Sequence, residues 1–229
     1  MLNVMIAEDN VPMSVHLSND INTKDVRCIA IANEGTRVYK KVKELKPDLL
    51  LLDLKMPGKN GIQILDEIAN DKEIKTEVII YSGENEYMTL VRNYECVTMF
   101  ISKITPTEEV GRKVQLIADE KSNKKIENKV SDILLKLGFS YTMKGTRLIS
   151  DCIIYSIREN IENINDIYNN IAEKKGCNTY TIKSDIYTAI NAMWKYTDKE
   201  KTRKILRIGE CDRPSAKLVI SMIKYYVER

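Results

Sequence analysis

The feature that most constrains the fold is the stretch 49–61, in which an apolar run ends on a carboxylate. Four consecutive leucines at positions 49–52 are typical of a strand buried on both faces, as in a parallel sheet. The run ends at Asp53 and gives way to the loop and turn residues Pro57, Gly58 and Gly61. Ligands of open parallel sheets bind beyond the carboxyl ends of the strands. We therefore expect Asp53 at the mouth of a core strand, where the stability of the fold needs no acid.

Length and composition are those of an ordinary globular chain. The 229 residues are 43% hydrophobic and 30% charged, which leaves room for one large domain or two smaller ones. No apolar run approaches the roughly 20 residues that span a bilayer, and acids at Glu8 and Asp9 come too early for a signal peptide. Five scattered cysteines and a single histidine favour neither a zinc site nor a disulfide framework. We expect a cytoplasmic protein with no membrane partner.

Charge is divided unevenly along the chain. Residues 1–120 carry 15 Lys and Arg against 20 Asp and Glu, whereas residues 121–229 carry 21 against 13. The opposite signs suggest two domains with different partners, the basic one facing a polyanion, although a chance division is the alternative.

The first 120 residues alternate short apolar runs with amphipathic ones. This alternation predicts a parallel sheet with helices on both faces, whose right-handed crossovers gather all strand carboxyl ends on one edge. The expected strands cover residues 2–7, 26–32, 49–53, 78–82 and 97–101. The expected helices lie near residues 11–21, 35–45, 60–70, 86–93 and 106–120.

Several chemically useful residues fall at that edge. Glu8 and Asp9 follow the first expected strand, Asp53 the third, and Lys103 the fifth. Converging carboxylates repel one another, and a hard divalent cation such as Mg²⁺ relieves that repulsion. With a lysine to contact a phosphoryl oxygen, the set predicts an aspartate that attacks phosphorus and becomes an acyl phosphate. Helix capping by the acids and a solvated lysine form the alternative explanation.

The arrangement resembles the receiver domain of two-component response regulators. The matching residues are the acidic pair Glu8-Asp9, the block of Asp53, Met56, Pro57 and Gly61, the hydroxyl of Ser82, the aromatic Phe100, and Lys103. In this family the lysine is usually followed by proline, whereas here Ile104 follows it, so the resemblance leaves the geometry of this loop open.

The resemblance implies a flavodoxin-like, five-stranded fold with Asp53 phosphorylated by a histidine kinase or a phosphotransfer protein. It implies a Mg²⁺ ion held by Asp9, Asp53 and the backbone carbonyl of Lys55, with Glu8 helping through water. It also implies a switch in which Ser82 moves toward the phosphoryl group, Phe100 turns inward and Lys103 contacts the phosphoryl oxygens. A new charge would then bias a two-state element.

The remainder of the chain is expected to be helical. Residues 121–129 are polar and charged and predict a flexible linker. From residue 130 apolar stripes recur at helical spacing, Gly138 ends the first helix, and Lys144-Gly145 is expected to form a turn. We thus divide the chain into a domain over 1–120, a linker over 121–129 and a helical domain over 130–229.

Within that helical domain, two segments form a helix-turn-helix pattern. Ala172 lies in the first helix, Gly176 in the turn, and Ile182 on the buried face of the second. Such a motif places its second helix in the DNA major groove. An ordinary helical hairpin fits the pattern equally well. The candidate DNA contacts on the second helix are Thr181, Lys183, Ser184, Tyr187, Thr188 and Asn191.

Residues 130–229 also resemble the effector domain of the sporulation-initiation response regulators of endospore-forming bacteria. The shared residues include Lys144-Gly145, the segment 167–176, Ala189-Ile190 with Trp194, and the segment 213–226. The resemblance implies a six-helix domain that binds double-stranded DNA as a homodimer once the receiver is phosphorylated. The reading helix of that family is rich in arginine, glutamate and histidine, so we expect a divergent relative with a different target sequence.

Three functions remain for comparison. The first is a phosphorylation-regulated DNA-binding transcription regulator of a two-component or phosphorelay system. The second is a response regulator whose effector domain has lost specific DNA binding and acts through protein–protein contacts. The third is an aspartyl-phosphate phosphatase, which the residue two positions after Asp53 argues against, because those enzymes carry an acid where this chain has Lys55. We expect no enzyme.

Overall fold

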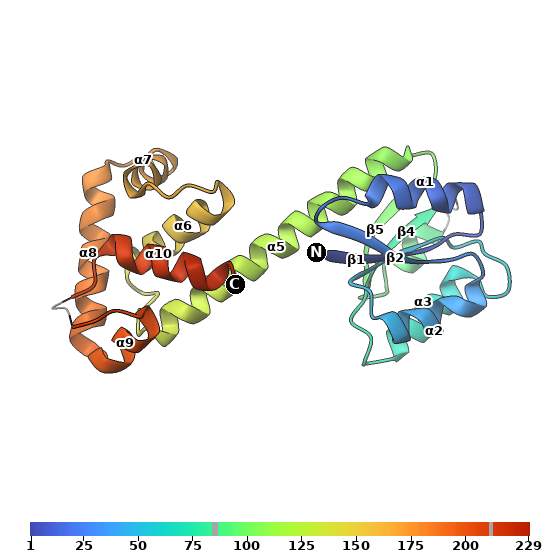
Figure 1. Cartoon of the computed structure of the whole chain (residues 1–229). Helices are drawn as coiled ribbons and strands as arrows, with labels where there is room; N and C mark the ends of the chain where they lie inside the picture. Colours follow the sequence, from blue (N-terminus) through green and yellow to red (C-terminus); the bar gives the residue numbers. More distant parts are fainter. Residues whose placement is uncertain (84–86, 211–212) are drawn as a thin grey trace. The chain divides into compact units, whose positions relative to one another are not determined.

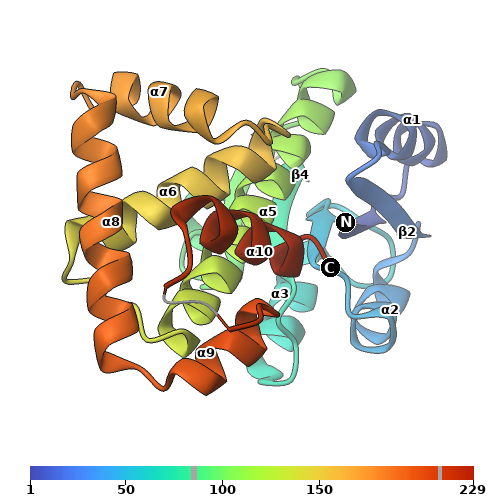
Figure 2. The ribbon, with the colours of Figure 1, turned by 60° about the vertical axis from the view of Figure 1, so that its left-hand side comes forward.

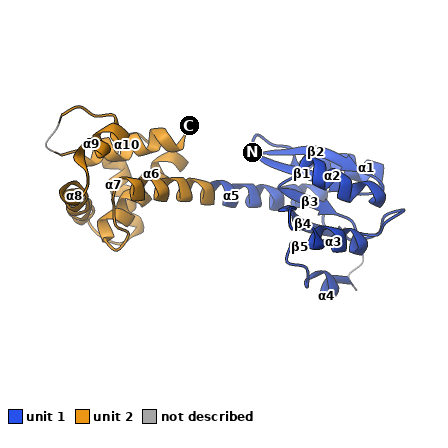
Figure 3. Cartoon of the chain, turned by 90° about the horizontal axis from the view of Figure 1, so that it is seen from below, with its two compact units in different colours: residues 1–122 blue, residues 123–229 orange. Residues whose placement is uncertain are grey.

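The computed structural model describes residues 1–83, 87–210 and 213–229, which divide into two compact units. Unit 1 covers residues 1–122 and unit 2 covers residues 123–229, coloured separately in Figure 3. Part of the segment 86–93, where a helix was predicted, lies outside the described residues.

Unit 1 is a five-stranded parallel sheet with the order β2-β1-β3-β4-β5 (Figure 1). The flavodoxin-like fold expected from the sequence is therefore confirmed. The strands are β1 (Leu2–Ala7), β2 (Val26–Ala32), β3 (Leu49–Leu52), β4 (Glu77–Ser82) and β5 (Val97–Ser102). The helices are α1 (Val11–Ile21), the 3₁₀ turn η1 (Gly35–Arg37), α2 (Val38–Leu45), α3 (Gly61–Asn70), α4 (Met88–Val91) and the beginning of α5 (Thr107–Lys136).

The leucine run packs both faces of the sheet. Side chains alternate along a strand, so Leu49 and Leu51 join the cluster under α1 and α5, while Leu50 and Leu52 join the one under α2 and α3. All four leucines are at most 1% exposed. Full burial on both faces explains why the strand is apolar without alternation.

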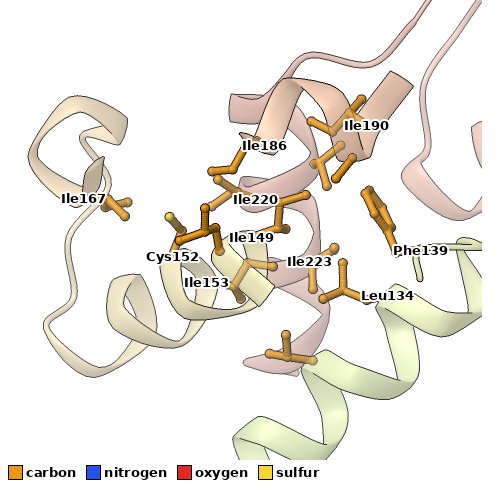
Figure 4. Packing of buried hydrophobic residues seen from close by; sticks show 14 of the residues in the cluster. Leu134, Phe139, Ile149, Cys152, Ile153, Ile167, Ile186, Ile190, Ile220 and Ile223 are labelled. Carbon is orange, nitrogen blue, oxygen red and sulfur yellow. The ribbon is translucent and has the colours of Figure 1, made fainter. Parts of the chain in front are cut away.

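Unit 2 is helical and is built around one apolar core, part of which is drawn in Figure 4. Its helices are the end of α5, α6 (Lys144–Arg158), α7 (Ile164–Lys174), α8 (Thr179–Tyr196), α9 (Lys199–Leu206) and α10 (Ala216–Val227). Helix α6 packs against α8 and α10, and α7 packs against α8. In Figure 2, α7 and α8 meet at a steep angle, and α10 lies beside α6. The helical character expected for this half is confirmed.

Residues 121–129 are helical, which contradicts the prediction of a flexible linker there. They form part of α5. The segment contains neither glycine nor proline, and its lysines and glutamates have good helix propensity. Residues of the segment also have partners within their own units: Lys121 forms an ion pair with Glu77, and Ile126 packs against the core of unit 2. Charge and the lack of an apolar face did not prevent helix formation.

The turn predicted at Lys144-Gly145 is also wrong, because both residues lie in the first turn of α6. Gly145 is needed there for close packing rather than for a turn. A Cβ atom at this position would lie 1.9 Å from the backbone oxygen of Asp185 in α8. By contrast, Gly176 does occupy a turn, between α7 and α8, with a φ of 61° that favours glycine.

Candidate functional site

The acids predicted to gather at the sheet edge do so in unit 1. Glu8 directly follows β1, and its amide donates to the Ala32 oxygen across 3.0 Å. Asp53 directly follows β3, and its amide donates to the Ala7 oxygen across 2.9 Å. These two ladder bonds extend the parallel pairing by one residue at each strand end. The backbone therefore brings the two carboxyl groups to the same edge of the sheet.

Lys103 connects the two buried acids. Its Nζ lies 2.8 Å from Asp53 Oδ2 and 2.8 Å from Glu8 Oε2. The side chains of Glu8 and Asp53 are only 1% and 2% exposed, whereas that of Lys103 is 26% exposed. A single ammonium thus contacts two buried carboxylates and offsets the charge of one of them.

Burial raises the pKa of Glu8 above its usual 4.5, while the hydrogen bond and positive charge of Lys103 act in the opposite direction. For Lys103, burial acts to lower the pKa, but the hydrogen bonds to Asp53 and Glu8 prevail and raise it. Lys103 therefore stays protonated, and the crevice keeps a cation next to Asp53.

The same edge fits a divalent cation. Glu8, Asp9 and Asp53 each offer a carboxylate oxygen, and these oxygens lie within 4.8 Å of one another. Oxygen-only donors of this kind suit Mg²⁺. Asp9 is exposed, which leaves one side of the cluster open to water. Asp9, Asp53 and the backbone carbonyl of Lys55 remain the predicted ligands, with Glu8 acting through water.

Two further predicted residues lie close to this edge. Ser82 is the last residue of β4 and is fully buried, and its backbone oxygen accepts from the Lys103 amide across 3.1 Å. Phe100 in β5 is half-buried and packs against the cluster under α2 and α3. Their roles in a switch stay predictions. No cis peptide bond occurs among the described residues, so the link from Lys103 to Ile104 is trans.

The sequence interpretation missed Tyr81, which borders the same site. The Tyr81 hydroxyl donates to the Thr105 oxygen across 3.3 Å, so it connects β4 to the loop that follows Lys103. Burial raises the pKa of Tyr81, and the negative charge of Glu8 adds to the effect. In the sequence, the position of Tyr81 directly before Ser82 could have indicated that it borders the site.

In unit 2, the helix-turn-helix arrangement has the expected packing. Ala172 and Ile182 are buried, and the Cys177 amide donates to the Ala172 oxygen across 3.0 Å in the turn. Asn178 caps α8 by accepting from the Thr181 amide across 2.8 Å. The face of α8 opposite its apolar stripe is exposed at Lys183, Ser184 and Tyr187.

The six candidate DNA contacts lie along that face, and several of their polar groups have intramolecular partners. Lys183 donates to Asn165 Oδ1 across 3.3 Å, and the Thr188 hydroxyl bonds back to the Ser184 oxygen across 2.9 Å. Lys183, Ser184, Tyr187 and Thr188 are exposed, whereas Thr181 and Asn191 are half-buried.

Arg213 also reaches this face, although it lies outside α8. Its Cζ lies 4.1 Å from the centre of the Tyr187 ring, and its Nη1 donates to Asn191 Oδ1. A hydrogen bond from Asn191 lowers the pKa of the exposed Tyr187 hydroxyl, and the positive charge of Arg213 lowers it further. The sequence pattern of α8 could not reveal this arginine, which is 22 residues away from Asn191.

Comparison with known proteins matches each of the two units to a protein family. Residues 4–115 match the response regulator receiver domain family. Residues 130–227 match the family described as "Sporulation initiation factor Spo0A C terminal". The chain therefore belongs to the two-component response regulators, with a receiver domain followed by a C-terminal domain of the sporulation-factor type.

Similarity to individual proteins is partial. The DNA-binding transcriptional activator EvgA of Escherichia coli K12 is 29% identical over 86 residues, or 38% of this chain and 42% of the relative. The oxygen regulatory protein NreC of Staphylococcus aureus is 33% identical over 90 residues, with the same two coverages. The chain thus spans less than half the length of these curated relatives.

Among solved structures, the response regulator domain of Thermotoga maritima CheB is 27% identical, covering 52% of this chain and 95% of that one with a TM-score of 0.46. A LuxR-family DNA-binding response regulator from Staphylococcus aureus is 24% identical, covering 52% and 99% with a TM-score of 0.47. Within the described residues, no helix is both long and apolar enough to cross a membrane.

Proposed function

We propose that this protein is a transcription regulator that binds DNA under the control of phosphorylation at Asp53. The observation that carries the proposal is the position of Asp53: its carboxylate is at the mouth of a core strand, 2.8 Å from Lys103 Nζ. The family match of both units and the similarity to EvgA, a DNA-binding transcriptional activator, support the same function.

In the proposed reaction, an Asp53 carboxylate oxygen attacks the phosphorus of a phosphohistidine on a kinase or phosphotransfer protein. A new P–O bond forms, the P–N bond breaks, and the imidazole leaves with its electron pair and gains a proton. Lys103 provides a positive charge for the phosphoryl oxygens, since its Nζ already lies within contact distance of Asp53. A Mg²⁺ ion bound to the acid cluster would neutralise further charge on those oxygens.

Phosphorylation then changes the charge at the centre of the Lys103 contacts. The ammonium now shared by Glu8 and Asp53 gains the phosphoryl oxygens as competing partners. Ser82 and Phe100 would follow as the predicted switch residues, and the phosphorylated form is expected to dimerise and bind double-stranded DNA through α8.

The test uses the full-length protein with acetyl phosphate and magnesium. We expect one added phosphoryl group by mass spectrometry, located on Asp53, and tighter binding to a selected DNA duplex in a gel-shift assay. Binding that is equal on all sequences, and that disappears with added salt, would exclude specific recognition. A partner protein retained after nuclease treatment would then favour an effector that acts through protein contacts.

A further inference from the structure

The face of α8 carries a positive group that belongs to another part of the chain. Arg213 precedes α10, which packs against α8. Its guanidinium lies over the Tyr187 ring at 4.1 Å and donates to Asn191 Oδ1. Tyr187 is 54% exposed and Asn191 is one helical turn further along, so all three side chains share one strip of the solvent-facing surface.

These contacts hold the arginine without neutralising it. Within the described part of the chain, no ion pair between Arg213 and a carboxylate is found, and its partners there are the ring and hydroxyl of Tyr187 and the amide oxygen of Asn191, all of them neutral. The charge therefore remains available to a ligand. The other long cation on this face, Lys183, is already directed at Asn165 and lies near the Tyr168 ring.

The contacts leave part of the guanidinium fork unused. A guanidinium has five N–H donors in a planar fork; one on Nη1 donates to Asn191, and the Tyr187 hydroxyl accepts another. Three donors remain for contacts with a base. Stacking on a tyrosine and these hydrogen bonds also restrict the rotamers of Arg213 before binding, which reduces the entropy lost on association.

From this arrangement we infer that Arg213 reads a guanine in the major groove, with Tyr187 and Asn191 as the residues that position it. Guanine presents two acceptors, O6 and N7, at the spacing of a guanidinium fork. The inference rests on the proposed DNA-binding function and deepens it: part of the sequence specificity comes from outside the recognition helix. It also reassigns Asn191, whose amide oxygen accepts from Arg213, from a base contact to a support.

The experiment is a selection of bound duplexes from a random library, using phosphodonor-treated full-length protein and its Arg213→Met variant. Methionine is a long, unbranched side chain without an N–H donor, whereas lysine could still donate to guanine. We expect the wild type to require guanine at one position of each half-site. We expect the variant to lose that preference by on the order of tenfold or more, with the other positions unchanged.

Arg229→Met is the matched control. Arg229 also stacks on a tyrosine, with its Cζ 4.4 Å from the Tyr225 ring, but it follows the end of α10 that points away from α8 (Figure 1). This substitution should leave the selected sequence unchanged. Both preferences are ratios of affinities, so a misfolded fraction of either variant lowers all affinities equally and does not alter the readout.

Two outcomes overturn the inference while leaving DNA binding intact. An unchanged guanine preference in Arg213→Met would mean that Arg213 reads no base. A uniform loss of affinity on every sequence would assign it to the phosphate backbone. If the wild type itself selects no sequence, the proposed function fails. This failure differs from a failure of the inference on Arg213, because it is seen with the wild type alone.

Discussion

The acid crevice of unit 1 and the solvent face of α8 in unit 2 are organised in opposite ways. In the crevice, Glu8 and Asp53 are almost fully buried and are placed by backbone hydrogen bonds at adjacent strand ends. On α8, the polar groups are exposed or half-buried, and the arginine on this face comes from a separate segment. A buried charged site requires fixed geometry and paired charges, whereas an exposed reading surface needs only a stable platform and accessible donors.

The largest expected effect is at Asp53. Asp53→Asn should gain no phosphoryl group from acetyl phosphate, because an amide oxygen is not a nucleophile of comparable strength. Intact-mass measurement checks this. Asp48→Asn is the matched control, since Asp48 is an exposed acid at the other end of the same strand and accepts from the Asn3 amide. A mass gain in Asp53→Asn equal to that of the control would disprove the assignment.

The next effect concerns the platform under α8. Gly145→Ala places a methyl group against the backbone oxygen of Asp185, where no flexible side chain can yield, and should destabilise unit 2 by about 3 kcal/mol. Urea unfolding followed by the fluorescence of Trp194, the single tryptophan, measures this. Gly209→Ala is the control because a Cβ there meets nothing within 4 Å. Equal midpoints for the two variants would refute the close-packing argument.

A smaller effect is expected on the α8 face. Asn191→Ala removes the amide that holds Arg213, so affinity for the preferred duplex should fall about fivefold, equivalent to a hydrogen bond of ~1 kcal/mol. Fluorescence anisotropy on labelled duplex gives the dissociation constants. Asn70→Ala in α3 serves as control, since the Asn70 side chain donates to Asp66 in unit 1. If both variants bind as the wild type does, Asn191 does not position Arg213.

The smallest effect is a pH dependence in the crevice. Because the pKa of Glu8 is raised above 4.5 in the folded protein, folding takes up a proton, and this stability is present below pH 4.5 and lost as the pH rises above it. The wild type should therefore lose stability relative to Glu8→Gln between pH 4.5 and neutrality without added magnesium. Hydrogen exchange of the sheet amides measures the difference.

Asp71 provides a control of opposite sign for that measurement. Its pKa is lowered to about 2, first by the hydrogen bond from Lys43 and then by the Glu73 amide and Tyr39. The stability contributed by Asp71 is present above pH 3.8 and is lost as the pH falls toward 2. The difference in stability between the wild type and Glu8→Gln could stay constant from pH 4.5 to neutrality while Asp71→Asn shows its expected pH dependence. That result would show that folding does not raise the pKa of Glu8.

Much of unit 1 could be predicted because its signals are local. The strands at residues 2–7 and 26–32 have the expected bounds, and the leucine run correctly indicated a strand buried on both faces. Helix α9 was not predicted, because only Thr202 and Leu206 are buried in its eight residues and no apolar stripe is visible. The helical conformation of 121–129 was missed because a charged segment was interpreted by its polarity rather than by its helix propensity.

The sequence by itself determined which acids stand at strand ends, because a buried parallel strand must be apolar and must end where polar residues begin. Only the tertiary structure decided that Lys103 contacts Glu8, 95 residues away, and that Arg213 lies over Tyr187. Periodicity reports which face of an element is buried, but contacts between distant segments depend on how whole elements pack. The charge next to Asp53 and the arginine on α8 are therefore products of packing.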